Sequence, residues 1–353
     1  MKHGIFGYLI IGLLFAAALW QPIGAAEELN IYMWSEYIDP DIITDFETQT
    51  GLKVNLSLYE SSDEMMAKIQ YAGGVSQYDV VVVSNMMVPL MARLKLLQPL
   101  NLDAVPNRKN LEAPFLNPGY DPGTRYSLAY QWGTVGVMYN KTKFPNLPPS
   151  WSVIFDSGKE PGTFVLIDEM RDQLGVALIY LGYSANTTHP EEVRKAGKLV
   201  LDAKKSPNAQ GFEGGVGGKN RVAAETVDMA VVWNGDALRA IAEDKENRFA
   251  YVIPKEGSLV WADVMAIPAQ APHVGAAHQF INYILDANIG ARLSTYTEYA
   301  TPNHAAKKHL GAATLKNPVL YPPADVMKKL EYQQDVGEHT QLYDEVWTAV
   351  KAQ

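Results

Sequence analysis

The chain has 353 residues, a formal net charge of −9 and no cysteine. This length favours two domains, because one hydrophobic core seldom grows beyond about 250–300 residues. The lack of cysteine excludes disulfide bonds. The excess of acidic side chains argues against a nucleic-acid partner, whose phosphates call for Lys and Arg.

The first 26 residues have the pattern of a cleavable signal peptide. Lys2 comes first, an apolar run follows over 5–20, and the small residues Ala25 and Ala26 come after it. The run is about 16 residues long, shorter than the roughly 20 that a membrane span needs. We therefore expect cleavage after Ala25 or Ala26 and release of the mature chain into a periplasm.

The mature chain begins with strands and helices in alternation. Apolar strands are expected over 29–33 and 53–59, and helices over 40–50, which ends before Gly51, and over 62–71. Residues 79–83 are an aspartate followed by four valines, which is typical of a buried strand in a parallel sheet. This order predicts an α/β domain with a doubly wound sheet.

A second α/β series follows it. The patterns predict strands over 164–167, 229–233 and 265–267, and helices over 174–181, 190–203, 236–243 and 274–285. Ligands of open α/β sheets bind beyond the carboxyl ends of the strands. Four candidate site residues follow predicted strands in this way: Trp34, Ser84, Glu169 and Asp236.

Aromatic residues also stand next to acids or hydroxyls. The segments are Trp-Ser-Glu-Tyr at 34–37, Trp-Asn-Gly-Asp at 233–236 and Trp-Ala-Asp at 261–263. Trp261 and Asp263 would share one face of an extended segment, and Gly235 allows a tight turn or a close backbone approach. Each aromatic could equally be a core residue and each acid a cap. Three such pairs at strand ends together indicate a ligand site.

The acidic segment 168–172 follows a predicted strand and opens a helix. Acids in a first helical turn are already favoured by the helix dipole, so its members could be caps or ligand contacts. Carboxylates among aromatic rings suit a cation with apolar spacers, because ring faces attract ammonium groups by about 0.5–2 kcal/mol. Each buried methylene adds about 0.8 kcal/mol. Polyamines have this chemistry.

Other patterns are rejected. The glycine-rich segment 214–220 lacks the first glycine and the final Ser or Thr of a phosphate-binding loop and follows no predicted strand, so we expect a flexible loop. His304 and His309 are five apart, which is wrong for two metal ligands on one helical face. We expect no metal and no cofactor.

Seven segments of the mature chain match a known family in order and spacing. They are NIYMWSEYI (30–38), YDVVV (78–82), LGYSANTT (181–188), VWNG (232–235), PKEG (254–257), YATPN (299–303) and YPPA (321–324). On these segments the chain resembles the periplasmic spermidine/putrescine-binding proteins of ABC importers over almost its whole mature length.

The resemblance implies a set of ligand-binding residues. They are Trp34, Ser35, Tyr37, Ser84, Glu169, Asp172, Trp233, Asp236, Trp261, Asp263, Tyr299 and Gln333. Asp263 would hold an ammonium near the centre of the ligand, and Gln333 would cap one end, as in spermidine-preferring members. Two positions depart from that pattern: Met86 replaces a hydroxyl-bearing residue, and Asp236 resembles the putrescine-preferring members. With four acids in the pocket, spermidine is expected over putrescine.

The resemblance also implies a two-lobed α/β periplasmic binding protein fold, each lobe a mostly parallel sheet flanked by helices, with the ligand in the cleft between the lobes. The expected first lobe comprises 27–134 with 262–303, and the second 135–261 with 304–353. The implied partners are a polyamine and the permease subunits of an ABC importer, with the protein a monomer. Alternatives are another cationic solute, a ligand sensor, or a hydrolase with two carboxylates.

Overall fold

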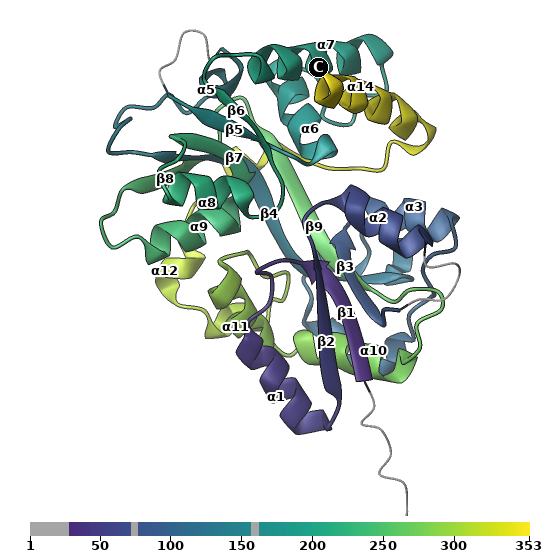
Figure 1. Cartoon of the computed structure of the whole chain (residues 1–353). Helices are drawn as coiled ribbons and strands as arrows, with labels where there is room; N and C mark the ends of the chain where they lie inside the picture. Colours follow the sequence, from purple (N-terminus) through teal and green to yellow (C-terminus); the bar gives the residue numbers. More distant parts are fainter. Residues whose placement is uncertain (1–27, 72–76, 157–161) are drawn as a thin grey trace, which may run out of the picture.

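The computed structural model describes residues 28–71, 77–156 and 162–353, so the predicted signal peptide lies outside the described residues. Figure 1 shows two lobes joined by two long strands, β4 and β9, which run through both. The strands are β1 Glu28–Trp34, β2 Lys53–Tyr59, β3 Val80–Ser84, β4 Ser127–Asn140, β5 Phe164–Ile167, β6 Ala209–Glu213, β7 Met229–Trp233, β8 Phe249–Val252, β9 Ser258–Ala266 and β10 Leu330–Tyr332.

The strands of both lobes form one continuous sheet in the order β2-β1-β3-β9-β4-β7-β5-β6, with β10 paired to β9 and β8 to β4. β2, β1 and β3 are parallel, as are β7, β5 and β6. β9 is antiparallel to β3, and β4 is antiparallel to β9, β7 and β8. The outer part of each lobe is thus parallel as predicted, but the strands that join the lobes make the sheet mixed.

Helices cover both faces of the sheet (Figure 1). In chain order they are α1 Pro40–Thr50, α2 Ser62–Tyr71, α3 Met87–Arg93, α4 Ala113–Leu116, α5 Ser152–Phe155, α6 Met170–Tyr180, α7 Pro190–Lys204, α8 Gly217–Ala223, α9 Asn234–Glu243, α10 Val274–Ile284, α11 Ala287–Thr297, α12 Ala312–Leu315, α13 Ala324–Met327 and α14 Thr340–Ala352. Single 3-10 turns lie at Leu102–Ala104, Pro106–Asn110, Pro122–Thr124, Ala306–His309 and Gly337–His339. No helix among the described residues is long and apolar enough to cross a membrane.

The core of the first lobe follows from the alternation of side chains along a strand. Ile31 of β1 packs with Phe46 of α1 and Phe280 of α10 on one face of the sheet. Its neighbour Tyr32 packs on the other face with Met65 of α2. Both faces are therefore buried, which explains why the first strands read as apolar runs.

Helix α1 is fixed at both ends by local chemistry. The Asp39 side chain accepts a hydrogen bond from the Asp41 N–H at 2.9 Å, and Pro40 takes the first helical position. Gly51 adopts a left-handed φ of 75°, and its N–H donates to the Glu47 carbonyl at 2.8 Å. The predicted bounds of this helix are confirmed.

Three sequence predictions need correction. The strand predicted over 265–267 is only the end of β9, and β4 was not predicted at all. The glycine-rich segment follows a strand, β6, and from Gly217 it is helix α8 and not a flexible loop. β4 is buried on both faces and contains Gly133 and Gly136, so its sequence has neither alternation nor a clean apolar run.

Candidate functional site

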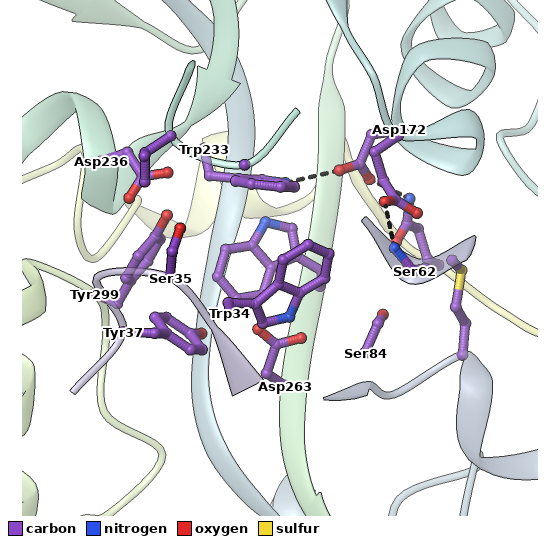
Figure 2. Close-up of a pocket in the computed structure, with 16 residues that line it drawn as sticks. Trp34, Ser35, Tyr37, Ser62, Ser84, Asp172, Trp233, Asp236, Asp263 and Tyr299 are labelled. Atoms are coloured by element: carbon purple, nitrogen blue, oxygen red, sulfur yellow. Dashed lines mark hydrogen bonds between the residues drawn. The ribbon is translucent and has the colours of Figure 1, made fainter. Parts of the chain in front are cut away.

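A pocket lies between the two lobes, beside the strands that join them (Figure 2). All twelve side chains that the family resemblance implies as ligand-binding line this pocket. Ser62, Met86, Gly215 and Val216 line it as well. Residues from 34 to 333 thus converge on one site.

The first lobe contributes residues at its strand ends. Trp34 is the last residue of β1, and Ser35 and Tyr37 lie in the turn before α1. Ser84 is the last residue of β3. These positions are at the carboxyl ends of parallel strands, where the topology predicts ligand contacts.

The second lobe contributes acids and one indole in the same way. Glu169 follows β5 and directly precedes α6, and Asp172 lies in the first turn of that helix. Trp233 ends β7, and Asp236 lies in the first turn of α9. The first helical turn tolerates carboxylates well, so the fold can direct two of them toward the pocket from helix starts.

Trp261 and Asp263 lie in the middle of β9 and not at a strand end, which corrects the sequence interpretation. Their spacing of two places both side chains on the pocket side of β9, as the alternation predicts. Asp263 is paired in register with Ser84 of β3. Opposite Trp261, Gly133 of β4 leaves room for the indole, since a Cβ there would lie 2.6 Å from the Trp261 ring.

Aromatic rings form a continuous series through the pocket (Figure 2). The ring centroids of Trp34 and Trp233 are 5.5 Å apart, those of Trp233 and Trp261 6.5 Å, and those of Trp261 and Tyr299 5.2 Å. Tyr37 continues the series 5.4 Å from Tyr299. The series gives the pocket ring faces for methylene groups and for cations.

Asp172 defines one end of the pocket, which we call the Asp172 end. The Trp233 indole N–H donates to Asp172 Oδ2 at 2.7 Å, and the Gln333 amide donates to Oδ1 (Figure 2). Next to it, the Ser62 N–H donates to Glu169 Oε2 at 3.2 Å. Ser62 and Glu169 belong to different lobes, so this hydrogen bond closes the pocket at that end.

Gln333 is held in place by two side chains behind it. The Asn85 amide N–H donates to the Gln333 carbonyl at 3.1 Å. The side-chain oxygen of Asn85 accepts from the Ala262 N–H at 3.1 Å. The buried Arg171 donates to the Gln334 carbonyl at 3.1 Å and lies over the Tyr343 ring. The C-terminal segment is thereby fixed against both lobes.

Asp236 defines the opposite end, the Asp236 end, where the Tyr299 hydroxyl lies next to the carboxylate (Figure 2). The Tyr299 ring packs on the backbone of Gly235, where a Cβ would lie 2.4 Å from ring atoms. The close approach that the sequence allowed at Gly235 is thus made by an aromatic ring.

The four carboxyl groups of the pocket are less acidic than usual. Burial raises the pKa of Asp172 to about 6, of Asp236 and Asp263 to about 7, and of Glu169 to about 8. Hydrogen bonds from Trp233 and Gln333 oppose the rise at Asp172, and the Tyr37 hydroxyl opposes it at Asp263. A cation bound between these carboxyl groups would stabilise their ionised forms.

Several buried polar atoms of the pocket make no hydrogen bond within the part of the chain that the structure describes. They are Trp34 Nε1, Ser35 Oγ, Ser84 Oγ and Trp261 Nε1. Buried polar groups are nearly always paired in folded proteins. These atoms are therefore available to a polar ligand.

Sequence reasoning did not single out Ser62, Gly215 or Val216. Ser62 starts a helix directly after the β2 strand, so the strand-end argument could have found it. Gly215 and Val216 lie in the glycine-rich segment that was interpreted as a flexible loop. The Gly215 N–H donates to the Glu60 carbonyl of the other lobe at 3.1 Å, a tertiary contact that no local pattern predicts.

A family model described as "Bacterial extracellular solute-binding protein" matches residues 41–323. The chain is 33% identical over 347 residues to the spermidine/putrescine-binding periplasmic protein of Escherichia coli, with 96% of this chain and 97% of the relative covered. It is 32% identical over 340 residues to the putrescine-binding periplasmic protein PotF of the same organism, with 91% and 90% covered.

Solved structures agree. The spermidine/putrescine substrate-binding protein PotD of Streptococcus pneumoniae superposes with a TM-score of 0.75 at 30% identity, with 92% of this chain and 99% of that chain covered. A Listeria monocytogenes protein with a provisional assignment to spermidine/putrescine ABC transport gives a TM-score of 0.85 at 34% identity, with the same coverage. The two-lobed α/β fold is confirmed, and the hydrolase alternative is wrong because these relatives bind solutes. The chain belongs to the family of bacterial extracellular solute-binding proteins of ABC transporters, within the group of spermidine/putrescine-binding periplasmic proteins.

Proposed function

We propose that this chain captures a polyamine between its lobes, spermidine in preference to putrescine, and delivers it to an ABC importer. The observation that carries the proposal is the set of four buried carboxyl groups along a series of aromatic rings. A linear cation with apolar spacers satisfies both kinds of surface at once. The twelve predicted residues are proposed as its contacts.

The carboxyl groups are spaced along the whole pocket. Asp172 stands at one end, Asp263 lies between the ends, and Asp236 stands at the other (Figure 2). Glu169 lies beside Asp172 at the start of α6. A protonated amine can approach a carboxylate at each of these three places, while the methylenes between amines lie on Trp34, Trp233 and Trp261. Three places for ammonium groups favour a triamine over a diamine.

The amide of Gln333 donates to Asp172 and so keeps that carboxylate turned toward the pocket. This arrangement supports a tightly held primary amine at the Asp172 end. The loss of a hydroxyl at Met86 is offset there by the Ser62 and Ser84 side chains, which line the same pocket. Both features support the preference for spermidine.

We further propose the lobe boundaries expected from the sequence, 27–134 with 262–303 and 135–261 with 304–353. Closure of the two lobes about β4 and β9 would present a surface that the permease subunits recognise. Cleavage of the predicted signal peptide and action as a periplasmic monomer complete the proposal.

The direct test is calorimetric titration of spermidine and putrescine into the mature chain, after unfolding and refolding to remove bound ligand. We expect saturable binding of both, with spermidine the tighter. Binding of neither ligand to protein with a cooperative thermal transition would contradict the proposal and direct attention to other cationic solutes. Tighter binding of putrescine would contradict the preference alone.

A further inference from the structure

A buried lysine stands behind the Asp236 end of the pocket. The side chain of Lys219, on α8, is 8% exposed, and its ammonium lies 2.8 Å from Glu36 Oε2. Lysine is almost never this buried without a partner of opposite charge. The pair joins α8 of the second lobe to the β1–α1 turn of the first.

Glu36 lies between two residues of the pocket, Ser35 and Tyr37, and has a left-handed φ of 53°. A residue other than glycine in this conformation is held by its surroundings. Arg239 of α9 provides a second cation, 3.6 Å from Glu36 Oε2. The Arg239 guanidinium also donates to the Glu36 carbonyl and to the Tyr296 hydroxyl, each at 3.4 Å.

Cations therefore stand next to the acids at this end of the pocket before any ligand binds. Lys219 and Arg239 share Glu36, and Arg239 also pairs with Glu243, 3.4 Å away. Among these neighbours, Lys219 is the main group that opposes the rise in the pKa of Asp236. At the other end, the Arg171 guanidinium acts on Asp172 from the same helix start.

We propose that Lys219 is a specificity-determining residue: its ammonium acts through Asp236 as an internal counter-ion and weakens binding of a ligand ammonium at that end. This proposal rests on the proposed polyamine function. A triamine that reaches the Asp236 end must share Asp236 with Lys219. A diamine can bind at the Asp172 end and Asp263 without that competition. Lys219 therefore lowers the affinity for spermidine but not for putrescine, and so makes the difference between the two affinities smaller.

The test compares the dissociation constants of spermidine and putrescine for the wild type and for Lys219→Met, which keeps the length of the side chain without its charge. We expect spermidine affinity to rise about tenfold and putrescine affinity to change by less than about twofold, because only the triamine uses the Asp236 end. Glu36→Gln should act in the opposite direction. It frees Lys219 to pair with Asp236 and lowers spermidine affinity selectively.

Lys219→Arg keeps the positive charge and should leave the ratio of the two affinities near the wild-type value. Lys198→Met removes an exposed lysine from the outer helix α7 and controls for net charge.

If Lys219→Met does not fold, as judged by thermal unfolding, Lys219→Gln with Glu36→Gln tests the same ratio. If the ion pair served only lobe closure, Lys219→Met and Glu36→Gln would each weaken the binding of both polyamines equally. The ratio of the two affinities would then stay unchanged, which would overturn the proposal. Wild-type protein that binds neither polyamine would instead refute the proposed function.

Discussion

The two ends of the pocket stabilise buried carboxylates by different means. At the Asp172 end, the carboxylate accepts hydrogen bonds from the Trp233 indole and the Gln333 amide. At the Asp236 end, the carboxylate has charged neighbours instead, namely Lys219, Arg239 and their common partner Glu36. Neutral donors orient a carboxylate and leave its charge for the ligand, whereas a nearby cation cancels part of that charge. The first arrangement therefore favours affinity, and the second favours discrimination between ligands.

Asp263 stands between the two ends, and its removal should have the largest effect. Asp263→Asn keeps the shape of the side chain but leaves a bound ammonium without a charged partner in a buried site. We expect the affinity for spermidine and putrescine to fall about fiftyfold each, since breaking a buried pair costs more than about 2 kcal/mol. Calorimetric titration measures this. Asp202→Asn on the exposed face of α7 is the matched control, and retained affinity would exclude Asp263 from the site.

The pH dependence of binding should follow from the raised pKa values at both ends. Because Asp172, Asp236, Asp263 and Glu169 have pKa values of about 6, 7, 7 and 8, part of them is protonated near neutral pH. A polyamine binds the ionised forms, so affinity should rise about tenfold from pH 6 to pH 8 with release of protons. Titration in two buffers of different ionisation enthalpy measures the released protons. Binding without proton release would show that the carboxyl groups are already ionised.

The same pKa values set the stability of the ligand-free protein. The native carboxyl groups bind protons more tightly than in the unfolded chain, where Asp has a pKa of about 3.9. Between about pH 4 and pH 8 the native state therefore holds more protons, and the free energy of unfolding falls as the pH rises. Ligand-free protein should melt at a higher temperature at pH 5.5 than at pH 8.

A direct comparison of the two ends is given by Asp172→Asn and Asp236→Asn. The first variant removes a carboxylate that two neutral donors orient, and we expect spermidine affinity to fall about tenfold. The second variant removes a carboxylate whose charge Lys219 already partly neutralises, so spermidine affinity should fall only about threefold. Titrations of both variants under one set of conditions test the difference. Equal losses would contradict the distinction between the ends.

The smallest effect is expected from Gly235→Ala. The new methyl group would lie 2.4 Å from atoms of the Tyr299 ring, so the ring must move away from Asp236. We expect a loss of about twofold to threefold in spermidine affinity and a lower melting temperature. Gly275→Ala in α10 is the control, because no atom lies within 4 Å of its added methyl group. An unchanged affinity with a lowered melting temperature would restrict Tyr299 to a role in packing.

The predictable part of the site is the part that depends on strand ends. Trp34, Ser84, Glu169 and Trp233 could be located because each ends or follows a short apolar strand, and parallel strands bring their carboxyl ends to one edge. Trp261 and Asp263 were identified by their spacing of two, although the strand that holds them was mostly missed. All residues of that strand are buried, so its sequence shows no alternation of apolar and polar residues.

The unpredictable part depends on contacts between segments far apart in the chain. Glu36 and Lys219 are separated by 183 positions, and Lys219 follows a glycine-rich turn with no local pattern that indicates burial. Periodicity reports which face of an element is buried, but not which charged side chain of another element will meet it. The internal counter-ion of the pocket could therefore be found only in the folded structure.

The position of β9 also has a consequence for the order in which the protein can fold. β9 lies between β3 and β4 in the sheet, yet it starts at Ser258, after the whole of the sheet of the second lobe except β10 has been specified. The first lobe lacks the strand that joins β3 to β4 until residue 266 of 353 is available. Contacts at such long sequence separation form slowly. The first lobe is therefore expected to complete its sheet late in folding, after the strands of the second lobe have formed.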